Sequence, residues 1–325
     1  MKILFVVSGN DDRYTIAPFI KSQGESLVER GMEVDYFPII GKGVTNYLKS
    51  IGKLRAHLRN QSYDLIHAHY SLSGWVAVLG SKKIPVVLSL MGDDALGTFK
   101  GVNKVEFKSR ILGLLAQFIQ PFVSAIITKS ANLEKFVYRK KISYLIPNGV
   151  RLDQFRIDQS IKRSDLGLEE NKRYVLFLGS PNDENKNFSL ARGAVACLKQ
   201  PDVELINIYD VPHDIVVKYL NLVNVFVLCS FSEGSPNVVK EAMACGCPMV
   251  VTQAGDAAWV VGNTPGCFVA SYEPANFAEQ LGKALQYGKT HCKTPGRDRI
   301  IELGLDAGSI ADKIISIYQT LKENK

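Results

Sequence analysis

The sequence has no apolar run long enough to cross a bilayer, which takes roughly 20 consecutive residues. The longest candidate, residues 111–127, is interrupted by Gln117, Gln120 and Pro121. The first residues, MKILFVVS, form a short β-branched run, and no small-residue cleavage site follows them. This start is typical of a strand and not of a secretory leader. We therefore expect a soluble, cytoplasmic protein.

Cysteine is absent from the first half of the chain, and all six cysteines lie between residues 197 and 292. Their neighbours are mostly apolar, so we expect buried free thiols in a reducing compartment. The pair Cys245 and Cys247 lacks a second ligand pair at the spacing of a zinc site. This absence argues against a metal site.

Two further absences exclude classes of function. No G-x-G-x-x-G follows the first strand, which argues against a nicotinamide-dependent Rossmann enzyme. The basic stretches carry no interleaved aromatic residues and no known binding motif, so nucleic acid is not an expected partner.

The charge is unevenly divided between the two halves. Residues 1–150 hold 20 Lys/Arg and 11 Asp/Glu, a net of +9, whereas residues 151–325 hold 19 and 21, a net of −2. A solvated face on helices is the simpler explanation. The alternative is attraction of the basic N-terminal domain to an anionic surface, either phospholipid headgroups at the inner face of the cytoplasmic membrane or a pyrophosphate-linked acceptor.

The length of 325 residues suits two domains of about 150 residues each. Short apolar strands alternate with helical segments, which predicts mostly parallel sheets covered on both faces. In the first half, the predicted strands are 2–8, 33–38, 65–68, 84–90, 125–128 and 144–146, and the predicted helices are 16–30, 44–60, 74–81, 105–123 and 132–140. In the second half, the strands are 174–178, 203–208, 225–229 and 249–252, the helices are 187–199, 216–222 and 236–244, and one or two more helices lie in 300–322.

This pattern predicts an α/β protein with two doubly wound, Rossmann-like domains, at residues 1–150 and 151–307. A C-terminal helix at about 308–325 could pack back on the first domain. Ligands of such folds lie outside the carboxyl ends of the strands, here in the cleft between the domains.

The segment 231–241, FSEGSPNVVKE, follows a predicted strand and opens a helix. Ser235 suits the N-cap and Pro236 the first helical turn. The free amides at the start of this helix would attract a phosphate. Glu233 precedes them, and Glu241 shares a helix face with Asn237. Because carboxylates accept paired hydrogen bonds from vicinal hydroxyls, the two glutamates suggest a sugar on one side of a pyrophosphate and a ribose on the other.

This segment resembles the E-x7-E signature of the retaining GT-B glycosyltransferases of glycosyltransferase family 4. Weaker resemblances occur in the family's order along nearly the whole chain. They are HAHYSLSG at 67–74 (H-x-H-x-x-x-S-G), MGDD at 91–94 (H-G-x-D), IPNGV at 146–150 followed by Phe155, and Gly255-Asp256 after the next strand.

The resemblance implies roles for individual residues. Glu233 would contact the donor hexose, Glu241 would bind the ribose, and Lys186 would neutralise the diphosphate leaving group. The residues assigned to catalysis are Glu233, Lys186 and Asp93. The residues assigned to donor binding are Gly179, Ser180, Lys186, Tyr209, Glu233, Gly234, Ser235, Pro236, Asn237, Val238 and Glu241. Gly9, His69, Met91, Gly92 and Asp94 are weaker candidates for the acceptor or the cleft.

Two positions depart from the family pattern. Ser180 and Pro181 stand where the family usually has an arginine, so Lys186 is the one evident diphosphate cation. Met91 replaces the histidine of H-G-x-D, and a thioether neither donates a hydrogen bond nor takes a proton. Asp93 or Asp94 could stand in for that histidine. His67 and His69 are interpreted as facing opposite sides of their strand, with His69 nearer the cleft.

The resemblance therefore implies transfer of a hexose from a UDP- or GDP-linked donor, with retention at the anomeric carbon and without a cofactor or a divalent metal. The acceptor would be a glycan or a lipid-linked chain in bacterial cell-surface polysaccharide synthesis. The two departures leave one alternative open, a non-catalytic GT-B partner or nucleotide-sugar-binding protein.

Overall fold

The structure is a computed structural model that describes residues 1–10, 14–81 and 83–323. The chain divides into two compact units. The first comprises Met1–Thr98, Val105–Gly149 and Ala307–Lys325, and the second comprises Phe99–Lys104 and Val150–Asp306. The C-terminal helix therefore belongs to the first unit. The short hairpin at 99–104 belongs to the second unit, although it lies far before residue 150 in the sequence.

The first unit is built on a parallel sheet with the strand order β2-β1-β3-β4-β7-β8. Its inner strands are buried and mostly apolar, which is the pattern of strands covered on both faces. The strands are β1 (Lys2–Ser8), β2 (Glu33–Ile39), β3 (Leu65–His69), β4 (Val86–Ser89), β7 (Ala125–Thr128) and β8 (Ser143–Leu145).

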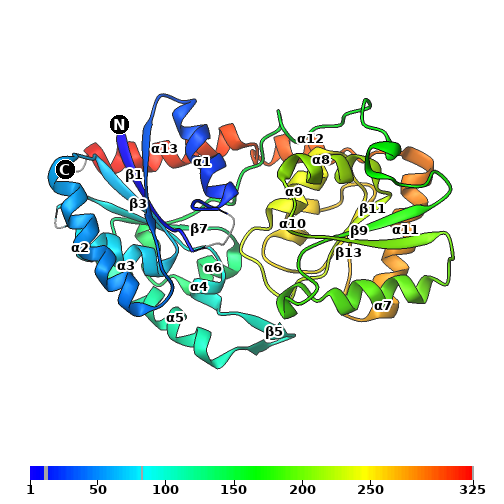
Figure 1. Cartoon of the computed structure of the whole chain (residues 1–325), viewed down its shortest axis with the longest axis horizontal. Helices are drawn as coiled ribbons and strands as arrows, with labels where there is room; N and C mark the ends of the chain where they lie inside the picture. Colours follow the sequence, from blue (N-terminus) through cyan, green and yellow to red (C-terminus); the bar gives the residue numbers. More distant parts are fainter. Residues whose placement is uncertain (11–13, 82, 324–325) are drawn as a thin grey trace. The chain divides into compact units, whose positions relative to one another are not determined.

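Helices cover both faces of this sheet (Figure 1). They are α1 (Pro18–Val28), α2 (Val44–Asn60), α3 (Ser71–Gly80), α4 (Asp93–Leu96), α5 (Phe107–Phe118), α6 (Ala131–Phe136) and the C-terminal α13 (Ala307–Glu323), with 3-10 turns η1 (Gln120–Phe122) and η2 (Lys140–Ile142). The core between the sheet and these helices is formed by aliphatic side chains, among them Leu4, Ile66, Leu88 and Ile126.

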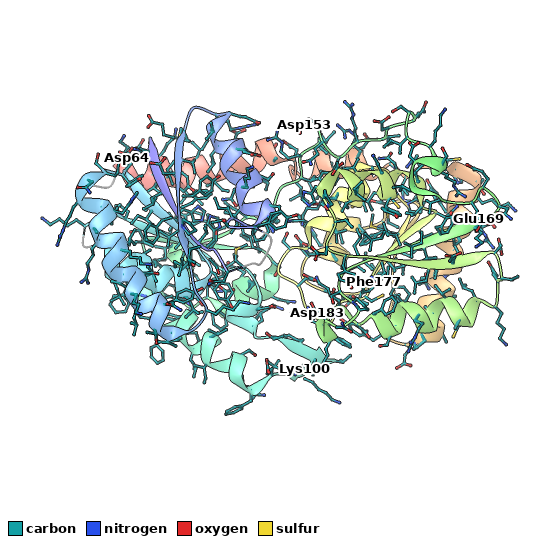
Figure 2. All side chains as sticks on the ribbon, viewed as in Figure 1. Asp64, Lys100, Asp153, Glu169, Phe177 and Asp183 are labelled. Atoms are coloured by element: carbon teal, nitrogen blue, oxygen red, sulfur yellow. The ribbon has the colours of Figure 1, made fainter. Side chains whose placement is uncertain are left out.

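The second unit repeats the architecture with a parallel sheet in the order β10-β9-β11-β12-β13. Its strands are β9 (Arg173–Leu178), β10 (Val203–Ile208), β11 (Val225–Leu228), β12 (Met249–Val251) and β13 (Cys267–Val269). Its helices are α7 (Phe188–Leu198), α8 (His213–Leu222), α9 (Asn237–Ala244), α10 (Ala257–Val261), α11 (Pro274–His291) and α12 (Gly296–Glu302), with 3-10 turns η3 (Arg163–Leu166) and η4 (Glu184–Lys186). Figure 2 labels Phe177, a fully buried residue of β9, and Asp183, which precedes η4.

The two doubly wound sheets confirm the predicted fold class, but two regions differ from the sequence prediction. The predicted helix at 105–123 is shorter, because residues 99–105 form a hairpin of β5 (Phe99–Gly101) and β6 (Lys104–Val105) with Asn103 at a positive φ of 59°. Pro121 then lies in η1, after α5 has ended. Between residues 253 and 295 the sequence analysis assigned no element, whereas the structure has α10, β13 and the long α11.

The cysteine prediction is wrong for two of the six residues. All six are free thiols, and four are buried, but Cys197 and Cys292 are exposed. Cys197 lies in the last turn of α7, and Cys292 follows the last residue of α11. An apolar sequence context alone did not distinguish these exposed helix ends from the strands that bury Cys229 and Cys267.

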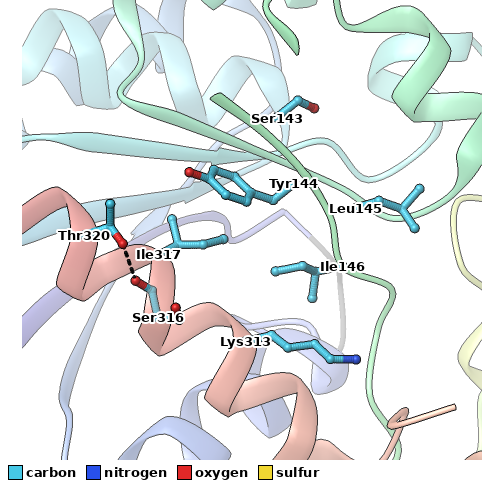
Figure 3. Close-up of a pocket in the computed structure, with 8 residues that line it drawn as sticks. All are labelled: Ser143, Tyr144, Leu145, Ile146, Lys313, Ser316, Ile317 and Thr320. Carbon is cyan, nitrogen blue, oxygen red and sulfur yellow. Dashed lines mark hydrogen bonds between the residues drawn. The ribbon is translucent and has the colours of Figure 1, made fainter. Parts of the chain in front are cut away.

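Helix α13 is held against the first unit by polar contacts as well as by packing. The hydroxyl of the fully buried Tyr318 lies 2.5 Å from Nδ1 of His67, in the central strand β3. Arg30 pairs with Asp312 at the surface. A pocket of about 540 Å³ lies between α13 and the edge strand β8, and Figure 3 shows Tyr144, Ile317 and Lys313 among its lining residues.

We predict that Tyr318→Phe destabilises the first unit by about 1–3 kcal/mol, because it leaves Nδ1 of a fully buried histidine without its partner. The two tryptophans of the chain, Trp75 and Trp259, lie in different units. Urea unfolding followed by Trp75 fluorescence in a Trp259→Phe background would measure the effect. The partly exposed Tyr144 offers a matched control, Tyr144→Phe, that should leave the midpoint unchanged. Equal midpoints for both variants would contradict this role of Tyr318.

Candidate functional site

The loop between β11 and α9 carries Glu233 and is tied to the turn that carries Lys186. The side chain of Asn185 makes two hydrogen bonds to the backbone of Ser232. Its Nδ2 donates to the Ser232 carbonyl over 2.9 Å, and its Oδ1 accepts from the Ser232 amide over 3.1 Å. The Phe231 amide also donates to the Asn185 carbonyl. The carboxyl ends of the neighbouring parallel strands β9 and β11 bring these two segments together. Sequence reasoning did not identify Asn185.

Glu233 and Lys186 form a close ion pair at this strand edge. Lys186 Nζ lies 2.6 Å from Glu233 Oε1, and the Glu233 side chain is the more buried of the two. Gly179 precedes them with φ of +155°, and a Cβ on it would lie 3.3 Å from Cγ of Lys186. A glycine here lets the lysine stem cross the end of β9. The structure thus brings together three residues that the sequence analysis assigned to one site.

The start of α9 differs from the prediction. Helix α9 begins at Asn237, with Pro236 at the N-cap position and no side chain capping it. Ser235 is therefore not the N-cap, because its hydroxyl is used elsewhere: its Oγ donates to Asp256 Oδ2 over 2.6 Å and accepts from Lys240 Nζ over 2.6 Å. The first amides of α9 lack intrahelical acceptors, as at any helix start, and no serine hydroxyl covers them.

Lys240 and Asp256 form a buried ion pair beneath this loop. The side chain of Lys240 is fully buried, and its Nζ lies 3.1 Å from Oδ2 of Asp256. Gly255, beside Asp256, has φ of +61°, and a Cβ on it would lie 2.7 Å from the Gly234 carbonyl oxygen. The Lys240–Asp256 pair therefore holds the loop through Ser235, and Gly255 packs closely against the loop backbone at Gly234. Asn237 Oδ1 is buried at the helix start and accepts no hydrogen bond within the described part of the chain.

Glu241, one turn further along α9, is buried and faces His213. Its Oε1 lies 3.9 Å from Nε2 of His213, the first residue of α8. Burial raises the pKa of Glu241 to about 7, an effect that the neighbouring Lys240 opposes. Burial also lowers the pKa of His213. At neutral pH the imidazole is therefore uncharged, and the contact is not a charged ion pair. His213 was missed in the sequence, where a histidine after Pro212 gave no signal.

Two further donor-site candidates, Ser180 and Tyr209, follow the ends of β9 and β10. Ser180 follows Gly179, and its Oγ accepts from the Asn182 amide over 3.3 Å. Tyr209 follows β10 and is exposed. The side chain of Asn207 donates to the Gly179 carbonyl over 2.8 Å, which fixes the end of β9 against β10. The structure leaves the roles of Ser180 and Tyr209 as predictions.

The prediction for the two histidines of β3 is wrong. His67 and His69 share one face of the strand, with ring centroids 4.3 Å apart and the rings stacked. Strand side chains alternate with a period of two, so residues two apart point the same way. Both are buried, and burial keeps the pKa of each well below its usual value, with Lys129 adding to the effect. His67 contacts Tyr318 and Ser89, whereas neither ring nitrogen of His69 has a partner within the described residues.

Asp94 supports the turn after β4 and is not exposed to a ligand. Its Oδ1 accepts from the amides of Met91 and Gly92 over 2.9 and 3.0 Å, and its Oδ2 accepts from the Ser71 amide over 2.8 Å. Burial raises its pKa while these amides lower it. Asp94 therefore joins the Met91 turn to the start of α3. Asp93 is exposed at the start of α4.

Met91 and His69 line one pocket of about 410 Å³ in the first unit. Its wall is mainly apolar, and its polar lining residues include Ser8 at the end of β1 and Asn10 after it. Gly9 lies between these two residues, and a Cβ on it would meet Ile40 at 2.6 Å. The other lining residues are Ala17, Phe19, Ile20, Lys42, Gly43, Tyr47, Tyr70 and Leu72.

Both halves of the chain match families of known proteins. Residues 16–154 match the family described as "Glycosyltransferase Family 4", and residues 199–287 match the one described as "Glycosyl transferases group 1". The second match includes the loop of Glu233, α9 and Glu241.

Two relatives give similar coverage. A glycosyltransferase of Bacillus subtilis assigned to teichuronic acid biosynthesis, TuaC, is 29% identical over 287 residues, which is 79% of this chain and 71% of the relative. An Escherichia coli UDP-Gal:alpha-D-GlcNAc-diphosphoundecaprenol alpha-1,3-galactosyltransferase is 23% identical and covers 86% of this chain and 81% of its own length.

Solved structures show the same fold at low sequence identity. Sucrose-phosphate synthase from Thermosynechococcus elongatus superposes with a TM-score of 0.80 at 18% identity and covers 100% of both chains. HepE from Anabaena, in complex with UDP and glucose, gives a TM-score of 0.72 at 18% identity, covering 98% of this chain and 100% of its own.

We predict that Glu241→Gln stabilises the protein in a pH-dependent way. A carboxyl whose folded pKa of about 7 lies above its ordinary value contributes stability below pH 4.5 that is lost as the pH rises to 7. The neutral glutamine avoids this loss, so the variant should gain up to about 3 kcal/mol over the wild type above pH 7 and little at pH 4.5. Thermal or urea unfolding across this range would measure the difference. The exposed Glu273→Gln serves as control, and a pH-independent gain would exclude burial as the cause.

We also predict strong coupling between Lys240 and Asp256. Removing one partner leaves a buried charge uncompensated, so Lys240→Met or Asp256→Asn alone should cost about 3–5 kcal/mol, and Lys240→Met/Asp256→Asn less than the sum. Trp259 in α10, three residues after Asp256, reports unfolding of this unit. Additive losses in the double-mutant cycle would show that the pair does not support the loop.

Proposed function

Because the chain is a GT-B glycosyltransferase of glycosyltransferase family 4 and transfers a sugar from a nucleotide sugar, we propose its donor, its site residues and its acceptor class. The donor is a UDP- or GDP-linked hexose. The acceptor is a glycan or a lipid-linked chain in bacterial cell-surface polysaccharide synthesis. The single observation that carries the proposal for the site is the ion pair of Lys186 and Glu233 beside the uncapped start of α9.

The diphosphate of the donor lies, in this proposal, between the start of α9 and Lys186. The amides of Asn237 and Val238 carry the positive end of the helix dipole, which favours an anion. Departure of the nucleoside diphosphate builds negative charge, and the Lys186 ammonium stabilises it. The contact of Lys186 with Glu233 fixes the lysine side chain in place before the donor arrives. The family pattern has two cations for the diphosphate. In this proposal, Lys186 supplies one positive charge and the start of α9 takes the place of the second cation.

Glu233 and Glu241 have different surroundings, which supports different roles. Glu233 lies at the strand edge and is held by Lys186, so one of its oxygens remains for a hydroxyl of the donor hexose. Glu241 is deeper and lies beside His213, where its carboxyl suits the paired hydroxyls of a ribose. In this proposal, the exposed Tyr209 after β10 contacts the base.

The acceptor side of the proposal rests on the pocket of Met91 and His69. Within the described residues, the side chains that line this mainly apolar wall include no carboxylate, and His69 is buried in it. Retaining transfer in which a donor phosphate oxygen assists the acceptor hydroxyl is compatible with such a wall. The replacement of histidine by Met91 then removes a hydrogen-bond donor and leaves that step intact. The names of the relatives support a surface-polysaccharide acceptor, since TuaC is assigned to teichuronic acid and the E. coli relative to a diphosphoundecaprenol-linked acceptor.

We predict that the purified protein hydrolyses or transfers from at least one sugar in a panel of UDP-, GDP- and ADP-linked hexoses, measured as released nucleoside diphosphate. Glu233→Ala should lower turnover by roughly 100-fold or more while sparing the affinity for the free nucleotide. Glu241→Ala should weaken nucleotide binding itself by roughly tenfold, the equivalent of one lost hydrogen-bonding group. Calorimetry and steady-state kinetics separate the two effects.

Three outcomes would overturn parts of this proposal. Equal loss of nucleotide affinity in both glutamate variants would show that the two roles are wrongly assigned. Inactivity with the whole panel would exclude these donors. Tight nucleotide binding without turnover, unrescued by Met91→His, would favour a non-catalytic nucleotide-sugar-binding protein.

A further inference from the structure

Helix α5 exposes a stripe of large apolar side chains on its outer side. The stripe consists of Phe107, Ile111, Leu114 and Phe118, which are 77%, 56%, 54% and 65% exposed. At about 100° per residue these four positions fall within roughly 60° of one another around the helix axis. The opposite side, with Ser109, Gly113 and Ala116, faces the unit interior. A surface helix normally turns polar residues outward, so α5 is unusual in being apolar on both sides.

The stripe continues beyond the end of α5. Phe122 in η1 is 60% exposed, and its ring lies 5.9 Å from that of Trp75 in the neighbouring α3. Trp75 Nε1 donates to the Leu115 carbonyl, which fixes α5 against α3. Tyr138, 56% exposed, donates its amide to Oε1 of the buried Gln120. These contacts hold the exposed apolar surface in a defined position on the first unit.

Positive charge accompanies this surface. Residues 107–122 contain no Asp or Glu, and Arg110 is exposed at the edge of the stripe. The segment 135–141, KFVYRKK, contains four basic residues. Lys140 pairs with Glu134, which precedes the segment, whereas Lys135 and Lys141 are exposed. Arg139 Nη1 donates to the Gln120 carbonyl over 2.8 Å, so this basic segment lies directly against the end of α5.

We propose that α5 and the basic segment 135–141 form a membrane-docking surface that binds an anionic lipid bilayer. The apolar stripe enters the boundary between headgroups and acyl chains, with α5 parallel to the membrane plane, and the lysines and arginines contact lipid phosphates. The structure has no helix long and apolar enough to span a membrane within the described residues. This surface lies wholly in the first unit, and the proposal does not depend on the assignments at Glu233 and Glu241.

The charge of this surface favours a lipid bilayer over a second copy of the chain. A symmetric dimer through α5 would bring two identical basic segments together, and like charges repel.

Vesicle co-sedimentation tests the proposal directly. The wild-type chain should bind vesicles of phosphatidylglycerol and phosphatidylcholine, bind pure phosphatidylcholine roughly tenfold less, and lose affinity as salt rises. The variant Phe107→Gln/Phe118→Gln should bind anionic vesicles at least roughly tenfold less, because two inserted aromatic rings are removed. Trp259→Gln/Ile301→Gln removes two apolar side chains that are about half exposed on the second unit, and it should bind like the wild type.

Circular dichroism and nucleotide affinity would verify that the α5 variant is folded. Wild-type binding by the folded α5 variant would overturn the proposal, as would equal binding to charged and uncharged vesicles. A concentration-dependent dimer that the α5 substitutions abolish, together with no vesicle binding, would assign the stripe to a second copy instead. Activity on soluble donors plays no part in these outcomes, so a failure here leaves the proposed transfer reaction untouched.

Discussion

The loop between β11 and α9 in the second unit depends on the buried ion pair between Lys240 and Asp256. Their charges lie where water does not reach them, so each is stable only in the presence of the other. The pair also binds the hydroxyl of Ser235, which was the predicted N-cap of the helix that follows. The Ser235 hydroxyl is thus bonded to this pair, and no side chain caps the start of α9. In the proposed function, the same pair would support both the loop and the helix start that binds the diphosphate.

The first unit uses a buried carboxylate for a comparable purpose. Asp94 accepts three backbone amides from two segments and joins the Met91 turn to α3. The carboxylates of the molecule thus divide into two groups. Asp94 and Asp256 have their oxygens occupied by the protein and shape the loops. Glu233 and Glu241 contact Lys186 and His213, and the proposed function assigns them to hydroxyl groups of the donor.

Much of the fold was predictable because parallel sheets have a plain sequence pattern. Buried strands such as Ala125–Thr128 and Val225–Leu228 are almost wholly apolar runs, and α2 matched its predicted bounds of Val44–Asn60. The region 253–295 was not assigned, because α10 is only five residues long and α11 has a polar outer face. The hairpin at 99–104 depends on a turn with Asn103 at positive φ and on contacts with η4, which are far away in sequence.

The candidate site was predictable where spacing determines geometry, and less so where side chains from separate segments meet. Glu233, Glu241 and Lys186 were found through a motif, whereas Asn185, His213 and the partner of Lys240 have no local signal. Lys240 has the sequence context of a surface lysine beside a glutamate, and only the position of Asp256 after the next strand explains its burial. The misassigned face of His69 had a different origin, since strand periodicity itself predicts that residues 67 and 69 point the same way.

The position of Met91 illustrates how these constraints combine. Its turn is held by Asp94 through backbone amides, so the shape of the turn does not depend on the side chain at position 91. A thioether therefore replaces an imidazole without altering the backbone around it. The adjacent His69 is buried, and its lowered pKa leaves it neutral near pH 7, so a neutral imidazole remains in the wall of the same pocket. Met91 in place of histidine therefore makes one position of the pocket wall apolar, which favours an apolar part of the acceptor at that position.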